Sequence, residues 1–154
     1  MRSVGVVCVV VVIAALSAGP VGAASHATRC APTPNFGGGP DRAVPELRAK
    51  IGTGHVLTGV VLSPSCAPIA GARLSFWQSN AKGVYTQAGS GAVATNRSGR
   101  FRFEGPRPTA YDGRPAHIHI KVEAPGYDTL YTEYEPRGAA RRGSVRLVLT
   151  PSPL

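Results

Sequence analysis

Hydrophobic and polar positions alternate in short runs along most of the chain after residue 50. The run 100–104, Arg-Phe-Arg-Phe-Glu, alternates charged and aromatic residues, which is the period of a strand with one buried face. The run 55–62 is rich in β-branched residues, which is also typical of strands. The pattern predicts seven strands, at residues 55–62, 72–78, 84–86, 100–104, 115–123, 129–135 and 144–150.

Short strands joined by turns favour an all-β fold, a single β-sandwich of about seven to nine short strands. The 154 residues fit one domain. The 19 glycines and 14 prolines suit a fold with many turns. Residues 25–50 are rich in Pro, Gly and small polar residues, so we expect an extended arm there. The sandwich domain is expected over residues 51–154.

The first 24 residues have the order of regions found in a signal peptide. Arg2 supplies a positive charge, residues 4–16 are almost continuously apolar, and small residues follow up to Ala24. This order predicts an export signal that is removed, and hence a secreted protein. The apolar stretch is short for a membrane span, so we expect no stable membrane insertion after cleavage. A retained N-terminal anchor is the alternative.

Export determines what the cysteines can do. Cys8 would leave with the signal peptide, so that Cys30 and Cys66 remain. Two cysteines in an exported domain most simply form one disulfide, which would tie the arm to the first turn of the sandwich. Two free thiols are the alternative.

The formal net charge is +9 at pH 7. The basic residues are scattered, apart from Arg137, Arg141 and Arg142, which we expect in a solvated loop. Nucleic-acid binding normally shows a dense basic stripe with interleaved aromatic residues, so we expect no nucleic-acid partner. A positive field of this kind also attracts anionic small molecules or acidic polymers.

The densest candidate site is the run 111–119, Tyr-Asp-Gly-Arg-Pro-Ala-His-Ile-His. Residues two apart on a strand point to the same side, so His117 and His119 project together while Ile118 faces the core. Two imidazoles one strand pitch apart are able to chelate a metal ion. Alone, such a pair is a weak signal, and a surface pair without a metal is the alternative.

Two tyrosines strengthen the metal hypothesis. Tyr111 precedes the histidines across a Gly-containing loop that can fold back, and Tyr85 follows a strand and turn that would present it from a neighbouring strand. Phenolate is a hard anionic ligand that suits ferric iron. A bound cation also lowers the pKa of a phenol from its usual value of about 10. The other tyrosines are expected to be ordinary interfacial aromatics.

The run 77–85, Trp-Gln-Ser-Asn-Ala-Lys-Gly-Val-Tyr, together with the run 111–119, resembles the intradiol ring-cleavage dioxygenases that act on protocatechuate, catechol and hydroxyquinol. The likeness is greatest to their small secreted relatives and extends from about Gly59 to Glu135. It implies an intradiol dioxygenase core with a transthyretin-like appearance.

The resemblance also implies one non-haem Fe(III) ion as cofactor, and it gives each matching residue a role. Tyr85 matches the tyrosine that stays on the iron, and Tyr111 matches the axial tyrosine that leaves when substrate binds. His117 and His119 match the two histidine ligands. Arg114 matches the arginine over the substrate ring and is, with Tyr111, the expected catalytic residue.

Two further residues are candidates for substrate binding. Glu133 falls where the family often has a Gln near the oxygen pocket. Trp77 is a candidate for stacking on the substrate, although a place in the core is the favoured alternative. The implied partners are a small aromatic diol and O2, and the implied product is a muconate-type diacid formed by cleavage between the two hydroxylated carbons.

A second class of function is kept beside the enzyme. A transthyretin-like exported β-sandwich can act as a non-catalytic binding or adhesion module whose metal site is lost or repurposed. The complete set of four candidate ligands favours the enzyme, because a degenerate module would be expected to have lost at least one. The oligomeric state does not follow from the sequence.

Overall fold

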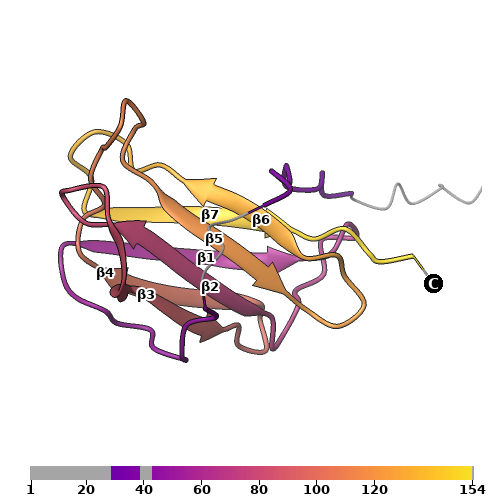
Figure 1. The fold of residues 1–154 in the computed structure, drawn as a ribbon. Helices are drawn as coiled ribbons and strands as arrows, with labels where there is room; N and C mark the ends of the chain where they lie inside the picture. Colours follow the sequence, from indigo (N-terminus) through magenta and orange to yellow (C-terminus); the bar gives the residue numbers. More distant parts are fainter. Residues whose placement is uncertain (1–28, 39–42, 154) are drawn as a thin grey trace, which may run out of the picture.

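Two β-sheets pack face to face in the structure, a computed structural model that describes residues 29–38 and 43–153 (Figure 1). The expected signal peptide, residues 1–24, lies outside the described residues. The described strands are β1 His55–Leu62, β2 Arg73–Ser79, β3 Tyr85–Ala94, β4 Arg100–Gly105, β5 Ile118–Glu123, β6 Leu130–Tyr134 and β7 Arg142–Val148. The predicted all-β sandwich is confirmed. No helix among these residues is long and apolar enough to cross a lipid bilayer.

The strand order places β5 in the interior of the larger sheet. The smaller sheet has the order β4-β1-β7, and the larger has the order β3-β2-β5-β6. β1 and β7 pair in parallel, while the other neighbours are antiparallel. Because β2 and β6 hydrogen-bond to β5 on both sides, the side chains of β5 have little freedom to shift.

Some strand boundaries differ from the prediction. β3 continues to Ala94, whereas the prediction ended at residue 86. The prediction was too short because Gly89 and Gly91 interrupt the alternation by which a strand is recognised in a sequence. At Gly91 an added Cβ would lie 2.5 Å from the carbonyl oxygen of Arg48, so the close passage of the arm requires a glycine here. β5 begins three residues later than predicted, and β7 begins two residues earlier.

The hydrophobic core lies between the inner faces of the two sheets. Phe76 stacks on Phe103 with ring centroids 4.2 Å apart. Ile118 and Ile120 point from β5 into this core, so His119 between them points to the opposite side of the sheet. The core also contains Leu57, Val61, Leu74, Val93, Phe101, Val122, Leu130, Leu147 and Leu149.

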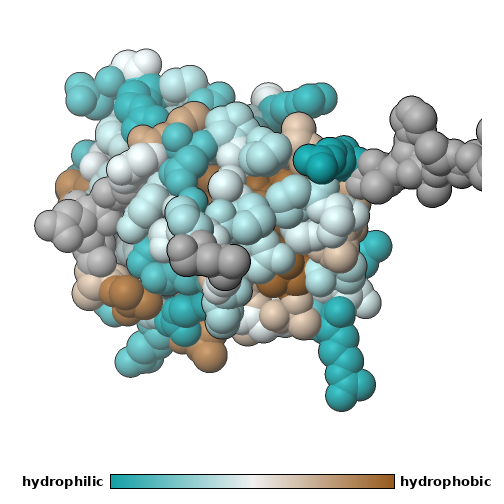
Figure 2. All heavy atoms as spheres, turned by 90° about the vertical axis from the view of Figure 1, so that its right-hand side faces the viewer, coloured by the Kyte–Doolittle hydropathy of each residue, from teal (hydrophilic) through white to brown (hydrophobic). Residues whose placement is uncertain are grey.

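The N-terminal arm runs along the open edges of the sheets. The backbone N–H of Thr33 donates to Val148 in β7, and that of Phe36 donates to Tyr131 in β6. Further along, the N–H of Arg48 donates to Ala92 in β3. These bonds occupy edge groups that would otherwise invite pairing with another chain. Figure 2, which views the end of the sandwich nearest the C-terminus, shows small apolar patches separated by polar atoms.

A disulfide between Cys30 and Cys66 joins the arm to the turn that follows β1, as predicted. The arm is also bonded at this point by the N–H of Cys30, which donates to the carbonyl oxygen of Pro64. The half-cystine Cys30 packs in a small cluster with Leu62 and Val148. The disulfide therefore fixes the start of the arm against both β1 and β7.

Replacing both cysteines, as Cys30→Ser with Cys66→Ser, should lower the free energy of unfolding by about 4 kcal/mol, because the bridge closes a loop across a sequence separation of 36 residues. Urea unfolding of the two proteins measures this difference. A loss below about 1 kcal/mol would show that the arm is held by its backbone bonds alone.

His55 is buried at the start of β1 and is not part of the candidate site. Its Nδ1–H donates to the carbonyl oxygen of Ala140, 3.0 Å away, while its Nε2 is buried without a partner. Burial lowers the pKa of His55, since the charged imidazolium would lose its hydration. The folded protein therefore favours neutral His55, and the unfolded chain binds its proton more readily.

The unfolding free energy should consequently fall as the pH decreases below about 6.5, the ordinary pKa of histidine. His55→Asn keeps a donor toward Ala140 but cannot become charged. In metal-free protein this variant should lose less stability than the wild type between about pH 7 and about pH 5. Urea unfolding at several pH values measures both curves, and parallel curves would contradict the assignment to His55.

Candidate metal centre

The candidate residues meet at one end of the larger sheet. β3 begins with Tyr85, and the loop between β4 and β5 carries Tyr111 and Arg114. His117 lies directly before β5, and His119 lies within β5. The register of the sheet places Glu133 of β6 directly beside His119.

Four donor atoms from different segments converge on one point. The hydroxyl oxygen of Tyr85 lies 2.5 Å from that of Tyr111 and 2.8 Å from Nε2 of His119. It lies 3.3 Å from Nε2 of His117, and the two Nε2 atoms are also 3.3 Å apart. Sequence reasoning named these four residues as ligands, and the structure brings all of them together.

The outer nitrogen of each imidazole has an acceptor that fixes its tautomer. Nδ1 of His117 lies 2.7 Å from the carbonyl oxygen of Pro115, and Nδ1 of His119 lies 3.1 Å from a carboxylate oxygen of Glu133. Because these oxygens only accept, each Nδ1 carries the hydrogen and each Nε2 presents a lone pair. Two lone pairs that face each other at 3.3 Å fit a shared cation, and this arrangement around Nδ1 is typical of metal-bound histidine.

Glu133 is an outer partner of this cluster and not a fifth converging ligand. His117, His119 and Glu133 have ligand atoms within 4.8 Å of one another, which by itself would suggest a three-residue metal site. However, the carboxylate contacts Nδ1 of His119, on the far side of the ring from Nε2, and its other oxygen accepts from Arg114. The two tyrosine hydroxyls are therefore the better partners for the histidine Nε2 atoms.

Two turns place the tyrosines. Asp112 and Gly113 both have positive φ, which is the pattern of an Asp-Gly hairpin turn between Tyr111 and Arg114. A second turn begins at Asn80, whose side-chain oxygen accepts from two backbone N–H groups of the turn that leads to Tyr85. The sequence predicted a loop in both places, and the two turns bring the phenols edge to face.

In the absence of a cation the site favours a neutral Tyr85 and a neutral His119, while Glu133 stays charged. Burial raises the pKa of Tyr85 above its usual range, and the hydrogen bond with Tyr111 adds to this effect. Burial lowers the pKa of His119 to about 4. Burial alone would raise the pKa of Glu133, but the hydrogen bond from Arg114 holds it below its ordinary value. A bound cation would reverse the effect on Tyr85.

Trp77 is placed mainly in the protein interior. It lies beside His119 in the sheet and is only 5% exposed, so it offers little ring surface for stacking on a substrate. Its burial leaves little room for the predicted role in substrate binding. Trp77 is not part of the core cluster between the sheets either, because it shares with His119 the face of the sheet that points away from that core. With Phe36, His119 and Glu133 it lines a cleft of about 10 Å³, which holds at most a water molecule.

Phe36 is a neighbour of the site that sequence reasoning missed. It comes from the arm, is 63% exposed and borders the cleft beside His119. Nothing in the local sequence marks it, because its position depends on a backbone bond between the arm and β6, remote in sequence.

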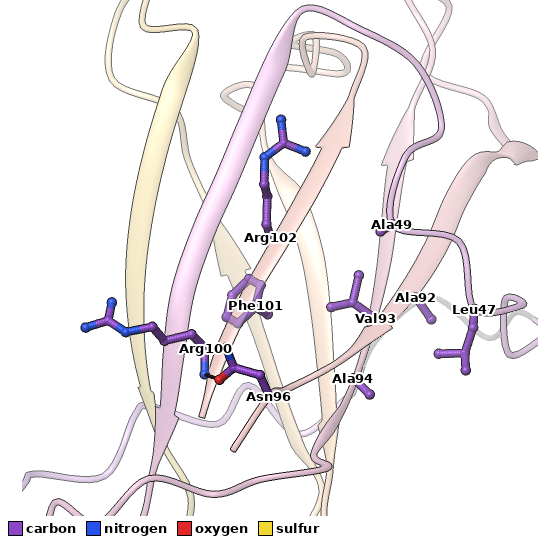
Figure 3. A pocket seen from close by; sticks show the side chains of 9 residues that line it. All are labelled: Leu47, Ala49, Ala92, Val93, Ala94, Asn96, Arg100, Phe101 and Arg102. Atoms are coloured by element: carbon purple, nitrogen blue, oxygen red, sulfur yellow. Dashed lines mark hydrogen bonds between the residues drawn. The ribbon is translucent and has the colours of Figure 1, made fainter. Parts of the chain in front are cut away.

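A larger hollow on the described surface lies away from the candidate site. It has a volume of about 510 Å³ and lies between the edges of β3 and β4 (Figure 3). Leu47, Ala92 and Val93 stand on one side of it, opposite Phe101. Apart from Asn96 and two arginines its lining is apolar, and it contains no group suited to acid–base or metal chemistry.

Relatives of known activity share this sequence pattern. No family model matches the chain. Catechol 1,2-dioxygenase of Candida albicans is 34% identical over 102 residues, which cover 49% of this chain and 34% of the relative. Hydroxyquinol 1,2-dioxygenase of a Rhizobium species is 33% identical over 53% of this chain and 37% of the relative. The chain thus spans about a third of the length of these relatives.

Solved structures share the fold over most of the chain. The dioxygenase domain of a dioxygenase–carbohydrate-binding protein fusion from Streptomyces sp. SirexAA-E is 27% identical, with a TM-score of 0.68. The match covers 79% of this chain and all of that domain. An intradiol ring-cleavage dioxygenase from Tetranychus urticae has the same TM-score at 19% identity, over 79% of this chain and 96% of its own, and shows the fold alone.

The fold and the site define a class: a β-sandwich in which two phenols and two imidazoles converge as candidate metal ligands. In sequence the chain is similar to catechol and hydroxyquinol dioxygenases, and in fold it is similar to intradiol ring-cleavage dioxygenases. This family implies a non-haem iron ion, and the donor set here fits one, since the phenol oxygens are hard ligands and both imidazole lone pairs point inward.

Gly83 packs against the ring of Tyr111, so a side chain added at Gly83 would press on that ring. It has a φ of +73°, and an added Cβ would lie 3.0 Å from the Tyr111 ring. Gly126 has a similar φ of +79° with open space around it.

Both Gly83→Ala and Gly126→Ala should lower the unfolding free energy by about 1 kcal/mol through backbone strain. Only Gly83→Ala should also weaken ferric ion binding, as measured by titration. Equal ferric affinities would show that Tyr111 is not displaced.

Proposed function

We propose that the protein is a secreted non-haem Fe(III) intradiol dioxygenase that cleaves a catechol-type ring between its two hydroxylated carbons. Both atoms of O2 would enter the product, a muconate-type diacid. The observation that carries the proposal is the convergence of two phenol oxygens and two imidazole nitrogens, with neighbouring distances between 2.5 and 3.3 Å.

Tyr85, Tyr111, His117 and His119 would hold the ion. A ferric ion bound there supplies Lewis-acid chemistry that draws electron density from a chelated diol and activates its ring toward O2. The histidines are suited to remain in place, because β5 is paired on both sides and each Nδ1–H is engaged. They provide the fixed half of the ligand set.

The two tyrosines differ in how firmly they are held. Tyr85 begins a strand and is paired with Ser79 in the sheet. Tyr111 lies in a loop, and among the described residues its backbone is bonded only to Arg114, through a short bridge. Tyr111 is therefore the phenol that can swing away and accept a proton from the incoming diol, while Tyr85 stays.

Arg114 is suited to stabilise negative charge on the substrate. Its side chain is 46% exposed and lies in the same turn as Tyr111. A guanidinium remains charged throughout the accessible pH range and donates several hydrogen bonds in one plane. It is therefore able to stabilise oxyanion character as the ring reacts.

Secretion rests on two supporting features. The order of charge, apolar run and small residues in positions 1–24 is that of an export signal. The Cys30–Cys66 disulfide fits an oxidising compartment. The alternative function, a non-catalytic binding or adhesion module, has no comparable support, because a module that only binds has no need of four converging metal donors.

The ligand set is tested by visible absorption of the protein loaded with ferric ion. A broad tyrosinate-to-iron charge-transfer band should appear and should shift to lower energy when catechol is added without oxygen. Tyr85→Phe should weaken ferric binding at least about tenfold and diminish the band. Tyr127→Phe, in a turn outside the site, is the matched control and should leave both unchanged. A wild-type protein that remains colourless would overturn the proposal.

The reaction is tested with isotopically labelled O2 and catechol. Mass spectrometry of the product should show a ring-opened diacid that carries both labelled oxygen atoms. An aldehyde-containing product would instead indicate cleavage beside the diol and would exclude the intradiol reaction. Arg114→Ala should reduce kcat about a hundredfold or more, if it loses one charged stabilising group of the usual strength.

A further inference from the structure

Glu133 connects two parts of the candidate site. One carboxylate oxygen accepts a hydrogen bond from Nη2 of Arg114 at 2.7 Å, and the other lies 3.1 Å from Nδ1 of His119. The three residues come from β6, the loop before β5, and β5 itself. The carboxylate side chain is only 18% exposed, so the contacts are partly shielded from water.

Only a carboxylate satisfies both neighbours. The Arg114 guanidinium can only donate. Nδ1 of His119 also donates, because its Nε2 faces the other candidate metal ligands and presents a lone pair to them. A glutamine in place of Glu133 would present one accepting oxygen and one donating amide nitrogen. One of the two hydrogen bonds would then be lost, with an N–H group facing another donor.

The ion pair between Glu133 and Arg114 also balances the positive charge of the arginine beside the site. An unpaired arginine at this position would attract a diol that carries an acid group on its ring. In this protein the charge of Arg114 is balanced by Glu133 at 2.7 Å, so an acid group gains little attraction and still loses its hydration on binding. A ring without an acid group does not incur this cost.

We propose that Glu133 determines the substrate class: it selects aromatic diols whose rings carry no acid group, while its second oxygen orients His119. This inference rests on the proposed dioxygenase function. Glu133 acts on the ring through Arg114 and on the metal site through His119, so it is a positioning residue for both.

The first test uses metal-free protein and does not depend on activity. Nitrogen-15 NMR of the histidine side chains should show the hydrogen of His119 on Nδ1 in the wild type. In Glu133→Gln this preference should weaken, and the two tautomers should mix. Glu135→Gln removes the same charge from an exposed position just past β6 and should leave the tautomer unchanged. An identical His119 signal in wild type and Glu133→Gln would overturn the orienting role.

The second test measures anaerobic binding of two diols to the ferric protein by the shift of its visible band. The diols are catechol and 3,4-dihydroxybenzoate, which differ by one carboxylate. The wild type should bind catechol more tightly. Glu133→Gln frees the charge of Arg114, so affinity for the acid relative to catechol should rise about tenfold or more. Glu135→Gln should keep the wild-type ratio.

The outcomes separate this inference from the proposed function. If the band and its shift appear but the wild type binds both diols equally, or if Glu133→Gln leaves the ratio unchanged, the selection is overturned while the dioxygenase proposal stands. If no diol shifts a visible band in any of the proteins, the proposed function fails and the selection fails with it.

Discussion

The rest of this site is arranged around two imidazole Nε2 atoms that lie 3.3 Å apart with their lone pairs facing inward. Facing lone pairs repel each other unless a proton or a cation lies between them. Here neither ring can turn away easily, because the hydrogen on each Nδ1 is bonded to an oxygen of Pro115 or of Glu133. The fold thus holds an arrangement that is unfavourable by itself. The hydroxyl of Tyr85 lies where it can relieve it, and a metal ion bound between the nitrogens would do the same.

The energy that holds this arrangement comes from the sandwich. Ile118 and Ile120 are almost completely buried in the core, and the alternation of a strand then forces His119 to the opposite side. Pairing of β5 with β2 and with β6 prevents a shift of register, which would exchange the two faces. The disulfide and the arm act at the sheet edges, so they protect the framework without contributing a ligand.

Local sequence was enough to predict what depends on alternation and on turns. It gave the all-β class, the shared direction of His117 and His119, and the loop that carries Tyr111. It missed most of β3, because Gly89 and Gly91 remove the alternating pattern, and Gly91 is the glycine that allows the arm to pass. The contact of Glu133 with His119 depends on pairing between two strands, and alternation within one strand carries no information about that register. Family resemblance placed Glu133 near the site but did not predict its two partners.

In the proposed function, the turn of residues 111–114 would link the departure of Tyr111 to the placement of the Arg114 charge. Tyr111 and Arg114 are its two ends and are bridged through their backbones, so one turn places both the phenol and the guanidinium. Glu133 lies outside the turn, on a strand, and holds the guanidinium through a short ion pair. In the proposed function this ion pair would hold the guanidinium in place while Tyr111 swings away. Since Glu133 also bonds to His119, one carboxylate anchors both the moving side of the site and its fixed side.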